Sequence, residues 1–224
     1  MKKISKAGLV LGLSTLAGMT GSAAAADDQT RYAGMMAGQP AITAADTAIS
    51  SRTTPVSAAN RPDQDAAMSQ LLALISRAES PVHGYDSVHF GARIKPGKPP
   101  SQLTVAEIQA WVRATPGQPH AIGRNQIIPA TFNRLVSALG LSGDTVYDRP
   151  TQDRMGRYLI EEAGYARFIA GRMSHDAFMD RLAKVWAGLP MADGRSAYHR
   201  YAGNRATITR AEYASAIMTI FPMR

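Results

Sequence analysis

The 224-residue sequence contains no cysteine, so neither disulfides nor thiolate metal sites are available to it. Its five histidines form no H-x-x-x-H or H-E-x-x-H pattern, which argues against zinc. No G-x-S-x-G sequence occurs, so a serine hydrolase of the nucleophile-elbow type is unsupported. We therefore expect no metal and no cofactor, and a core large enough to stabilise the fold without cross-links.

The sequence also lacks long apolar runs and long runs of like charge. A spanning helix needs roughly 20 apolar residues, and nucleic-acid binding is typically marked by clusters of five or six basic residues. Basic residues are still in excess, with 25 Lys and Arg against 17 Asp and Glu, a formal charge of +8. Such scattered charge indicates an anionic partner such as a cell-wall polymer, or serves solubility. We expect no nucleic acid and no stable membrane anchor.

Residues 1–26 have the layout of a secretory signal peptide. Three lysines precede an apolar stretch over 7–19, and four alanines lead to Asp27. Cleavage between Ala26 and Asp27 would leave 22 basic and 17 acidic residues, a formal charge of +5, since the leader holds three lysines and no acid. We expect the mature protein to be periplasmic or secreted.

Composition divides the mature chain into an arm and one domain. Residues 27–65 are rich in small and polar residues and predict a flexible N-terminal arm. Helix signals recur over 66–224, and short extended pieces are expected only near 88–94. The prediction is a single, mainly α domain with long connections at 80–103 and 114–128.

Caps and prolines mark where the helices of this domain begin. Thr104 with Glu107 three residues later predicts a capping box. The helix capped by Ser174 is expected to continue to Leu189-Pro190. The predicted starts lie at Thr104, Pro129, Pro150, Ser174 and Thr209.

The first helix of the domain ends in a carboxylate. Apolar residues from Met68 to Ile75 follow i, i+3, i+4, i+7 spacing, and the same stripe continues to Glu79 before Ser80-Pro81 ends the helix. Desolvation on an apolar face raises the pKa of a carboxyl group, and a raised pKa suits a proton donor. The alternative is a solvated Glu79, or one that pairs with a neighbouring arginine.

A second stretch, His120–Val136, has features of a sugar-binding turn. Gly123 allows a close approach of the backbone to another group. Gln126 offers both a donor and an acceptor, which suits sugar hydroxyls and acetamido groups. A glycine-containing loop before a helix is common, so this signal is weak by itself.

Taken in order, several short motifs resemble the lysozyme superfamily, and within it the lytic transglycosylases and phage lambda-type endolysins, which are muramidases like those of glycoside hydrolase family 104. The resemblance extends from about Ser69 to about Ile220. The motifs are "ISRAES" ending at Ser80, "HGYD" at 83–86, "GRNQ" at 123–126 followed by "IPAT", "QD" at 152–153, "WAGLP" at 186–190 and "YAGN" at 201–204.

The resemblance implies a lysozyme-like (α+β) single domain with long active-site loops. Its substrate would be the glycan strand of peptidoglycan, cut between N-acetylmuramic acid and N-acetylglucosamine. Glu79 would protonate the glycosidic oxygen and then act as base, so that the muramyl C6 hydroxyl closes a 1,6-anhydro ring. The chain departs from its relatives at Asn125, where an aromatic residue or Met is common.

The resemblance also implies which residues contact the sugar. The expected substrate-binding residues are Gln126, Tyr85, Asp86, Tyr201 and Asn125. For Tyr201 packing is an equal alternative, and Tyr198 competes for the same role. Trp111 and Trp186 are predicted to be core residues.

Two other functions stay open at this stage. A hydrolytic lysozyme would use Asp86 as a second carboxylate, although Asp86 has a structural role as an equal alternative. A non-catalytic wall-binding or secretion-assembly protein would keep the fold without needing Glu79. We expect a monomer that binds peptidoglycan glycan strands, with secretion or cell-envelope assembly factors as further partners.

Overall fold

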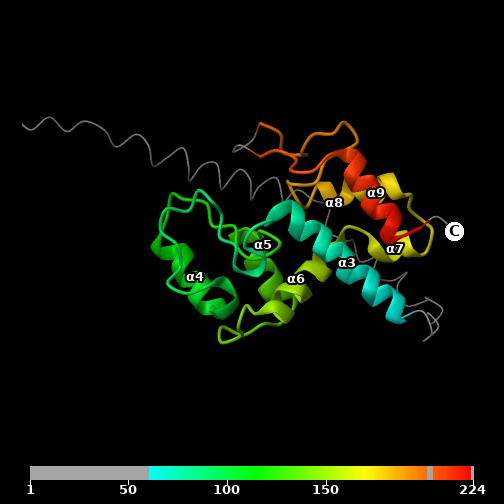
Figure 1. Ribbon diagram of the computed structural model, residues 1–224. Helices are drawn as coiled ribbons and strands as arrows, with labels where there is room; N and C mark the ends of the chain where they lie inside the picture. The colour runs from blue at the N-terminus through cyan, green and yellow to red at the C-terminus, as the bar shows by residue number, and fades with distance from the viewer. Residues whose placement is uncertain (1–60, 201–203, 223–224) are drawn as a thin grey trace, which may run out of the picture.

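The computed structural model describes residues 61–200 and 204–222, which are mainly helical with almost no strand (Figure 1). The mainly α prediction is confirmed. The predicted signal peptide, the arm up to residue 60 and Tyr201 lie outside the described residues. The elements are α3 (Arg61–Glu79), η3 (Gly84–Asp86), η4 (Pro100–Gln102), α4 (Val105–Ala114), α5 (Pro129–Ala138), α6 (Arg149–Glu162), α7 (Tyr165–Ile169), α8 (His175–Ala183) and α9 (Arg210–Ile220).

Local chemistry starts these helices where it was predicted to do so. Thr104 accepts from the backbone N–H of Glu107 at 3.2 Å, and the Glu107 carboxylate accepts from the Thr104 N–H at 2.8 Å. This capping box satisfies two otherwise unpaired N–H groups at the start of α4. Pro129 and Pro150 occupy the first turns of α5 and α6, where the missing N–H of proline costs nothing.

Helix α3 runs through the middle of the molecule and organises the core. In Figure 1 α4 and α5 lie to one side of α3 and α7, α8 and α9 to the other. α3 packs against α6 and α9, while α4 packs against α5. The predicted core residues Trp111 and Trp186 are buried. None of the helices described here combines the length and apolar character needed to cross a bilayer.

α3 begins at Arg61, ahead of the domain start at residue 66 expected from composition. The buried stripe of the helix starts only at Met68, and residues 63–67 are exposed or partly exposed. These residues share the polar composition of an arm, so composition alone does not mark where this helix begins.

α8 is shorter than predicted, ending at Ala183 rather than at Leu189-Pro190. The hydroxyl of Tyr198 donates to the carbonyl of Lys184, which in a continuing helix would accept from the N–H of Gly188. The chain instead turns between Leu182 and Leu189. This early end frees the Gly188 N–H for another partner.

Candidate active site

The candidate site is organised around Glu79, the last residue of α3. Ile75 and Ala78, on the same face of the helix, are buried in the core. Glu79 keeps part of its surface accessible to solvent. The predicted position of this carboxyl group, at the edge of the apolar stripe where the helix ends, is confirmed.

Burial dominates the electrostatics of this carboxyl group. Desolvation raises the pKa of Glu79 from 4.5 to about 7, and a hydrogen bond from the Gly188 N–H opposes the shift only in part. No lysine or arginine in the described ranges forms an ion pair with Glu79, so the alternative of an arginine partner is not realised. The acid is therefore half protonated near neutral pH.

The segment after α8 donates a hydrogen bond to this carboxyl group. The N–H of Gly188 lies 2.8 Å from Oε1 of Glu79. A Cβ atom at position 188 would lie 2.6 Å from the carbonyl oxygen of Ala78 and 3.1 Å from Oε1 of Glu79. Only glycine allows this approach, because a contact of 2.6 Å with backbone cannot be relieved by a side-chain shift.

Thr207 holds this segment against the end of α3. Its hydroxyl oxygen lies 2.7 Å from the carbonyl oxygen of Ala78, and its N–H donates to the carbonyl of Gly188 at 2.9 Å. The two bonds fix the Gly188 segment relative to the helix that carries Glu79. Sequence analysis missed both residues, and the glycine within "WAGLP" was the only local signal for either.

The turn from Gly123 to Gln126 is tied to the same end of α3. The hydroxyl of Ser80 donates to the carbonyl of Arg124 at 2.7 Å. Gly123 (φ 75°) and Gln126 (φ 44°) both adopt left-handed backbone conformations. A Cβ atom at Gly123 would lie 2.6 Å from the hydroxyl oxygen of Tyr147, so the close approach predicted for this glycine is confirmed.

Gln126 is partly exposed on this turn. Its side-chain N–H donates to the carbonyl of Gly123 at 3.0 Å, which fixes the amide plane. The amide oxygen has no partner among the described residues and is available to a ligand donor. Its predicted sugar contact thus remains a prediction that the geometry permits.

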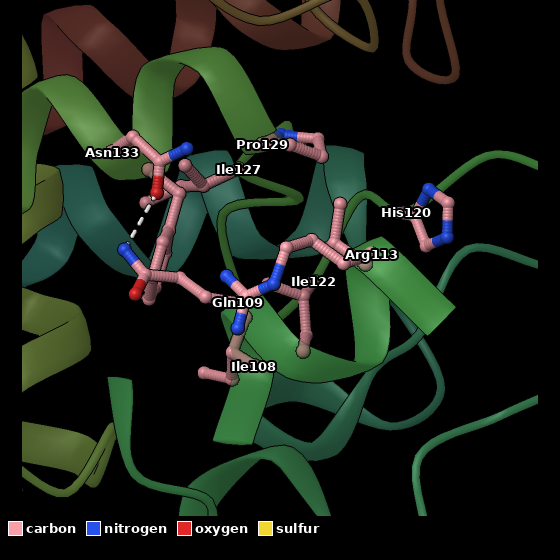
Figure 2. Close-up of a pocket in the computed structure, with 10 residues that line it drawn as sticks. Ile108, Gln109, Arg113, His120, Ile122, Ile127, Pro129 and Asn133 are labelled. Atoms are coloured by element: carbon pink, nitrogen blue, oxygen red, sulfur yellow. Dashed lines mark hydrogen bonds between the residues drawn. The ribbon is translucent and has the colours of Figure 1, made fainter. Parts of the chain in front are cut away.

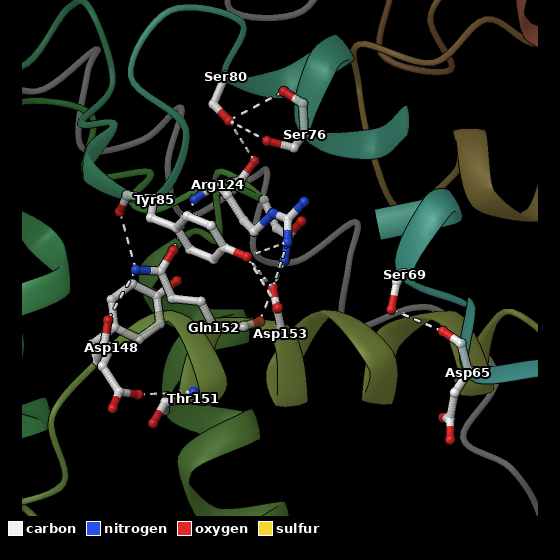
Figure 3. A network of polar contacts seen from close by, with 12 residues as sticks. Asp65, Ser69, Ser76, Ser80, Tyr85, Arg124, Asp148, Thr151, Gln152 and Asp153 are labelled. Atoms are coloured by element: carbon white, nitrogen blue, oxygen red, sulfur yellow. Dashed lines mark hydrogen bonds and ion pairs between the residues drawn. The ribbon is translucent and has the colours of Figure 1, made fainter. Parts of the chain in front are cut away.

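A polar network lies behind the turn (Figure 3). Arg124 bonds the hydroxyl of Tyr85 at 2.5 Å and the carboxylate of Asp153 at 2.6 Å. The Tyr85 hydroxyl donates to Asp153 at 3.0 Å. The fully buried side chain of Gln152 accepts from the Arg124 N–H at 2.9 Å and donates to the Tyr85 carbonyl at 3.0 Å. We refer to Tyr85, Arg124, Gln152 and Asp153 as the Arg124 network.

Membership of this network changes the interpretation of Tyr85. Its hydroxyl is bonded within the protein, and the guanidinium groups of Arg124 and Arg149 lie 4.6 and 5.1 Å from the centre of its ring. A ring and hydroxyl engaged in this way hold η3 against α6. Tyr85 therefore has a structural role, and its predicted stacking on a sugar stays a prediction.

The other predicted substrate contacts are distributed unequally. Asp86 is exposed, and its carboxylate accepts from the Ser101 N–H at 3.0 Å, which braces η3 against η4. Asn125 is only 2% exposed, and its amide is packed against Gly156 of α6, so a direct substrate contact does not fit. The site position of Tyr201 lies outside the described residues. Tyr198 is buried.

A hollow of about 260 Å³ lies elsewhere, between α4 and α5 (Figure 2). Ile108 and Phe132 contribute to its apolar lining, and Gln109 donates to Asn133 across it at 2.9 Å. His120 also lines it, with Nε2 bonded to the hydroxyl of Thr115 at 2.8 Å. Glu79 does not line this hollow, which is therefore separate from the candidate active site.

Nothing in the described ranges groups three or more potential ligands as a metal site would require. No protein-family model, curated protein or solved structure matches the chain. The geometry around Glu79, together with the motif pattern of the sequence, therefore carries the functional argument.

Proposed function

We propose that this protein is a lysozyme-like, peptidoglycan-cleaving lytic transglycosylase, periplasmic or secreted, in which Glu79 serves first as acid and then as base. The observation that carries the proposal is a desolvated carboxyl group with a pKa of about 7 on Glu79, a residue at the end of α3 that keeps part of its surface exposed. A group that titrates near the working pH is equally ready to give and to take a proton.

The Gly188 N–H supports a defined position for the acid proton. It donates to Oε1 of Glu79, so in the neutral acid Oε1 is the bare carbonyl oxygen and Oε2 carries the proton. Oε2 protonates the glycosidic oxygen between the two amino sugars, and the bond from that oxygen to the muramyl anomeric carbon breaks. The departing sugar keeps the proton as a hydroxyl hydrogen, and Glu79 is left as a carboxylate.

The same carboxylate completes the reaction. It takes the proton of the muramyl C6 hydroxyl while the C6 oxygen bonds to the anomeric carbon, which closes the 1,6-anhydro ring and restores neutral Glu79. The nucleophile belongs to the substrate itself, so no water has to be positioned and the entropic cost of attack is small. The partly exposed Gln126 is suited to bond the sugar beside the cut.

The surroundings of the other carboxylates favour transglycosylation over hydrolysis. A hydrolase generally needs a second carboxylate to activate water or to attack the sugar. Asp86 is bonded to the Ser101 N–H, and Asp153 is paired with Arg124. Both carboxylates thus have a structural partner, whereas one carboxyl group suffices for anhydro-ring formation.

Digestion of purified peptidoglycan sacculi, followed by mass spectrometry of the fragments, tests the proposal. The native protein should release fragments lighter by one water than the corresponding reducing-end products. Glu79→Gln should abolish clearing, and the matched control Glu161→Gln should retain it. Glu161 also has a pKa raised by burial, but it belongs to the opposite end of α6 from the Arg124 network. Full clearing by Glu79→Gln would overturn the proposal, and reducing-end fragments would replace it with hydrolysis.

A further inference from the structure

The turn from His89 to Lys95 presents a strongly exposed aromatic side chain. Phe90 is 94% exposed and Ile94 is 60% exposed. The imidazole of His89 stacks on Phe90 with ring centres 4.6 Å apart and an angle of 24° between the rings. One face of the Phe90 ring is thus supported by the protein, while most of the side chain remains open to an incoming flat, apolar surface.

The exposure of Phe90 does not come from a loosely held loop. The Gly91 N–H donates to Nδ1 of His89 at 3.0 Å, and the Ala92 N–H donates to the His89 carbonyl at 2.9 Å. A Cβ atom at Gly91 would lie 3.1 Å from the ring of Pro119, so the turn is seated closely on that residue. A turn built in this way holds its side chain in place before any partner arrives.

The far end of the turn is fixed as firmly. The side-chain oxygen of Gln118 accepts from the N–H groups of both Arg93 and Ile94 at 3.0 Å, and Trp111 donates to the Ile94 carbonyl at 2.9 Å. The turn is also part of the same assembly as the candidate active site. The backbone N–H of His89 donates to the carbonyl of Ala121 at 2.9 Å. Ala121 lies two residues before Gly123, the glycine that begins the predicted sugar-binding turn.

Positive charge flanks the exposed apolar residues. Arg93 and Lys95 are exposed, and no carboxylate in the described ranges pairs with either. Lys98, three residues after Lys95, forms an ion pair with Glu107 at 2.7 Å, so its charge is already balanced within the protein. The turn therefore combines an aromatic platform with two cations that pair with no carboxylate of the described residues, which suits an anionic ligand with apolar faces.

We propose that the His89–Lys95 turn is a second peptidoglycan-binding surface, on which Phe90 packs against the C–H face of a sugar ring while Arg93 and Lys95 bind carboxylates of the stem peptides. This inference rests on the proposed function, because it takes the same polymer as ligand. Peptidoglycan supplies both elements together, since its pyranose rings have apolar faces and its stem peptides carry free carboxylates. The surface would hold the strand while Glu79 acts on it.

The test measures binding separately from cleavage. All variants are made in the Glu79→Gln background, so that sacculi stay intact, and the dissociation constant for purified sacculi is measured by sedimentation. Phe90→Ala should weaken binding about threefold to tenfold, the usual range for one aromatic contact. Ile169→Ala, which removes a partly exposed apolar residue of α7, is the matched control and should leave binding unchanged.

The two halves of the surface are distinguished by the state of the polymer. On sacculi whose carboxylates have been converted to neutral amides by carbodiimide coupling with ammonia, Phe90→Ala should keep its effect, whereas Arg93→Ala with Lys95→Ala should lose the weakening that it causes on untreated sacculi. Unchanged binding of Phe90→Ala to intact sacculi would overturn the inference. So would a Phe90→Ala defect confined to anionic phospholipid vesicles, which would assign the turn to a membrane surface instead.

The experiments distinguish an error in the binding surface from an error in the catalytic assignment of Glu79. If Glu79→Gln still clears sacculi, the catalytic assignment is wrong; sedimentation is then carried out on ice before clearing begins, and weak binding by Phe90→Ala leaves the binding surface standing. If Glu79→Gln is inactive and Phe90→Ala binds normally, the catalytic assignment stands and the binding surface is wrong.

Discussion

Glu79 and Asp153 are two carboxyl groups in opposite environments: Asp153 pairs with Arg124 directly, whereas only the neighbour of Glu79, Ser80, contacts Arg124. Asp153 faces the Arg124 guanidinium at 2.6 Å and accepts from the hydroxyl of Tyr85. Glu79 is followed by Ser80, which bonds the Arg124 carbonyl, but among the described residues the Glu79 carboxyl group itself accepts only from the Gly188 N–H. A carboxylate with a cation beside it is a structural element, whereas a desolvated one without a cation is kept ready to exchange a proton.

The largest expected effect on activity comes from replacing each of the two carboxylates by its amide. Glu79→Gln should lower the rate of sacculus clearing by roughly 10²–10⁴-fold, the usual contribution of a general acid and base. Asp153→Asn should leave the rate almost unchanged but destabilise the fold by about 1–3 kcal/mol, because it leaves Arg124 partly buried without its counter-charge. Clearing assays and urea unfolding measure the two quantities. A larger loss of activity in Asp153→Asn than in Glu79→Gln would reverse the comparison.

The contact of Gly188 with the end of α3 provides the next test. Gly188→Ala should reduce clearing by roughly 10-fold to 100-fold, since its Cβ atom pushes the segment away from Ala78 and displaces the acid by a fraction of an ångström or more. Gly143→Ala is the matched control, because the nearest atom to its Cβ would be the Ala106 Cβ at an ordinary 3.5 Å. Equal activities of the two variants would remove Gly188 from the account.

The pH dependence of stability should also separate the two carboxylates. The folded pKa of Glu79 is about 7 and its ordinary value is 4.5, so the folded state binds the extra proton between these values. Stability is then fully present below pH 4.5 and falls as the pH rises through 7. Glu79→Gln should equal the native protein in stability at pH 4 and exceed it by about 3 kcal/mol at pH 8. Urea unfolding at both pH values measures this difference, and a constant difference would contradict it.

The smallest effect is expected at Asp86. Asp86→Asn keeps an oxygen for the Ser101 N–H, so under a single-carboxylate mechanism clearing should change by less than about twofold. A lysozyme that needed Asp86 as its second carboxylate would instead lose most of its activity. Clearing rates of this variant, measured beside the fragment masses of the native protein, therefore separate the two mechanisms.

What the sequence could predict was local. The capping box at Thr104, the prolines that open α5 and α6, and the position of Glu79 on its apolar stripe all depend on residues within one or two helical turns. The raised pKa followed from the same helical spacing. These features need no knowledge of the tertiary structure, and the structure agrees with them.

What the sequence could not predict depends on contacts between distant residues. Gly188 and Thr207 reach the end of α3 across more than 100 residues of chain. Tyr85 and Asn125 were predicted from their motifs to face a sugar. In the folded protein the Tyr85 hydroxyl bonds Arg124, and the Asn125 amide packs against Gly156. The motif gave the order of these residues along the chain and not the direction in which their side chains point.

The protonation of Glu79 is the central claim, and its titration is the most direct test. Carbon-13 NMR of the glutamate side-chain carboxyl groups, with Glu79 assigned from the signal missing in Glu79→Gln, gives its midpoint in the folded protein. The account predicts a midpoint at about 7. A midpoint close to 4.5, the value of an ordinary solvated glutamate, would contradict it.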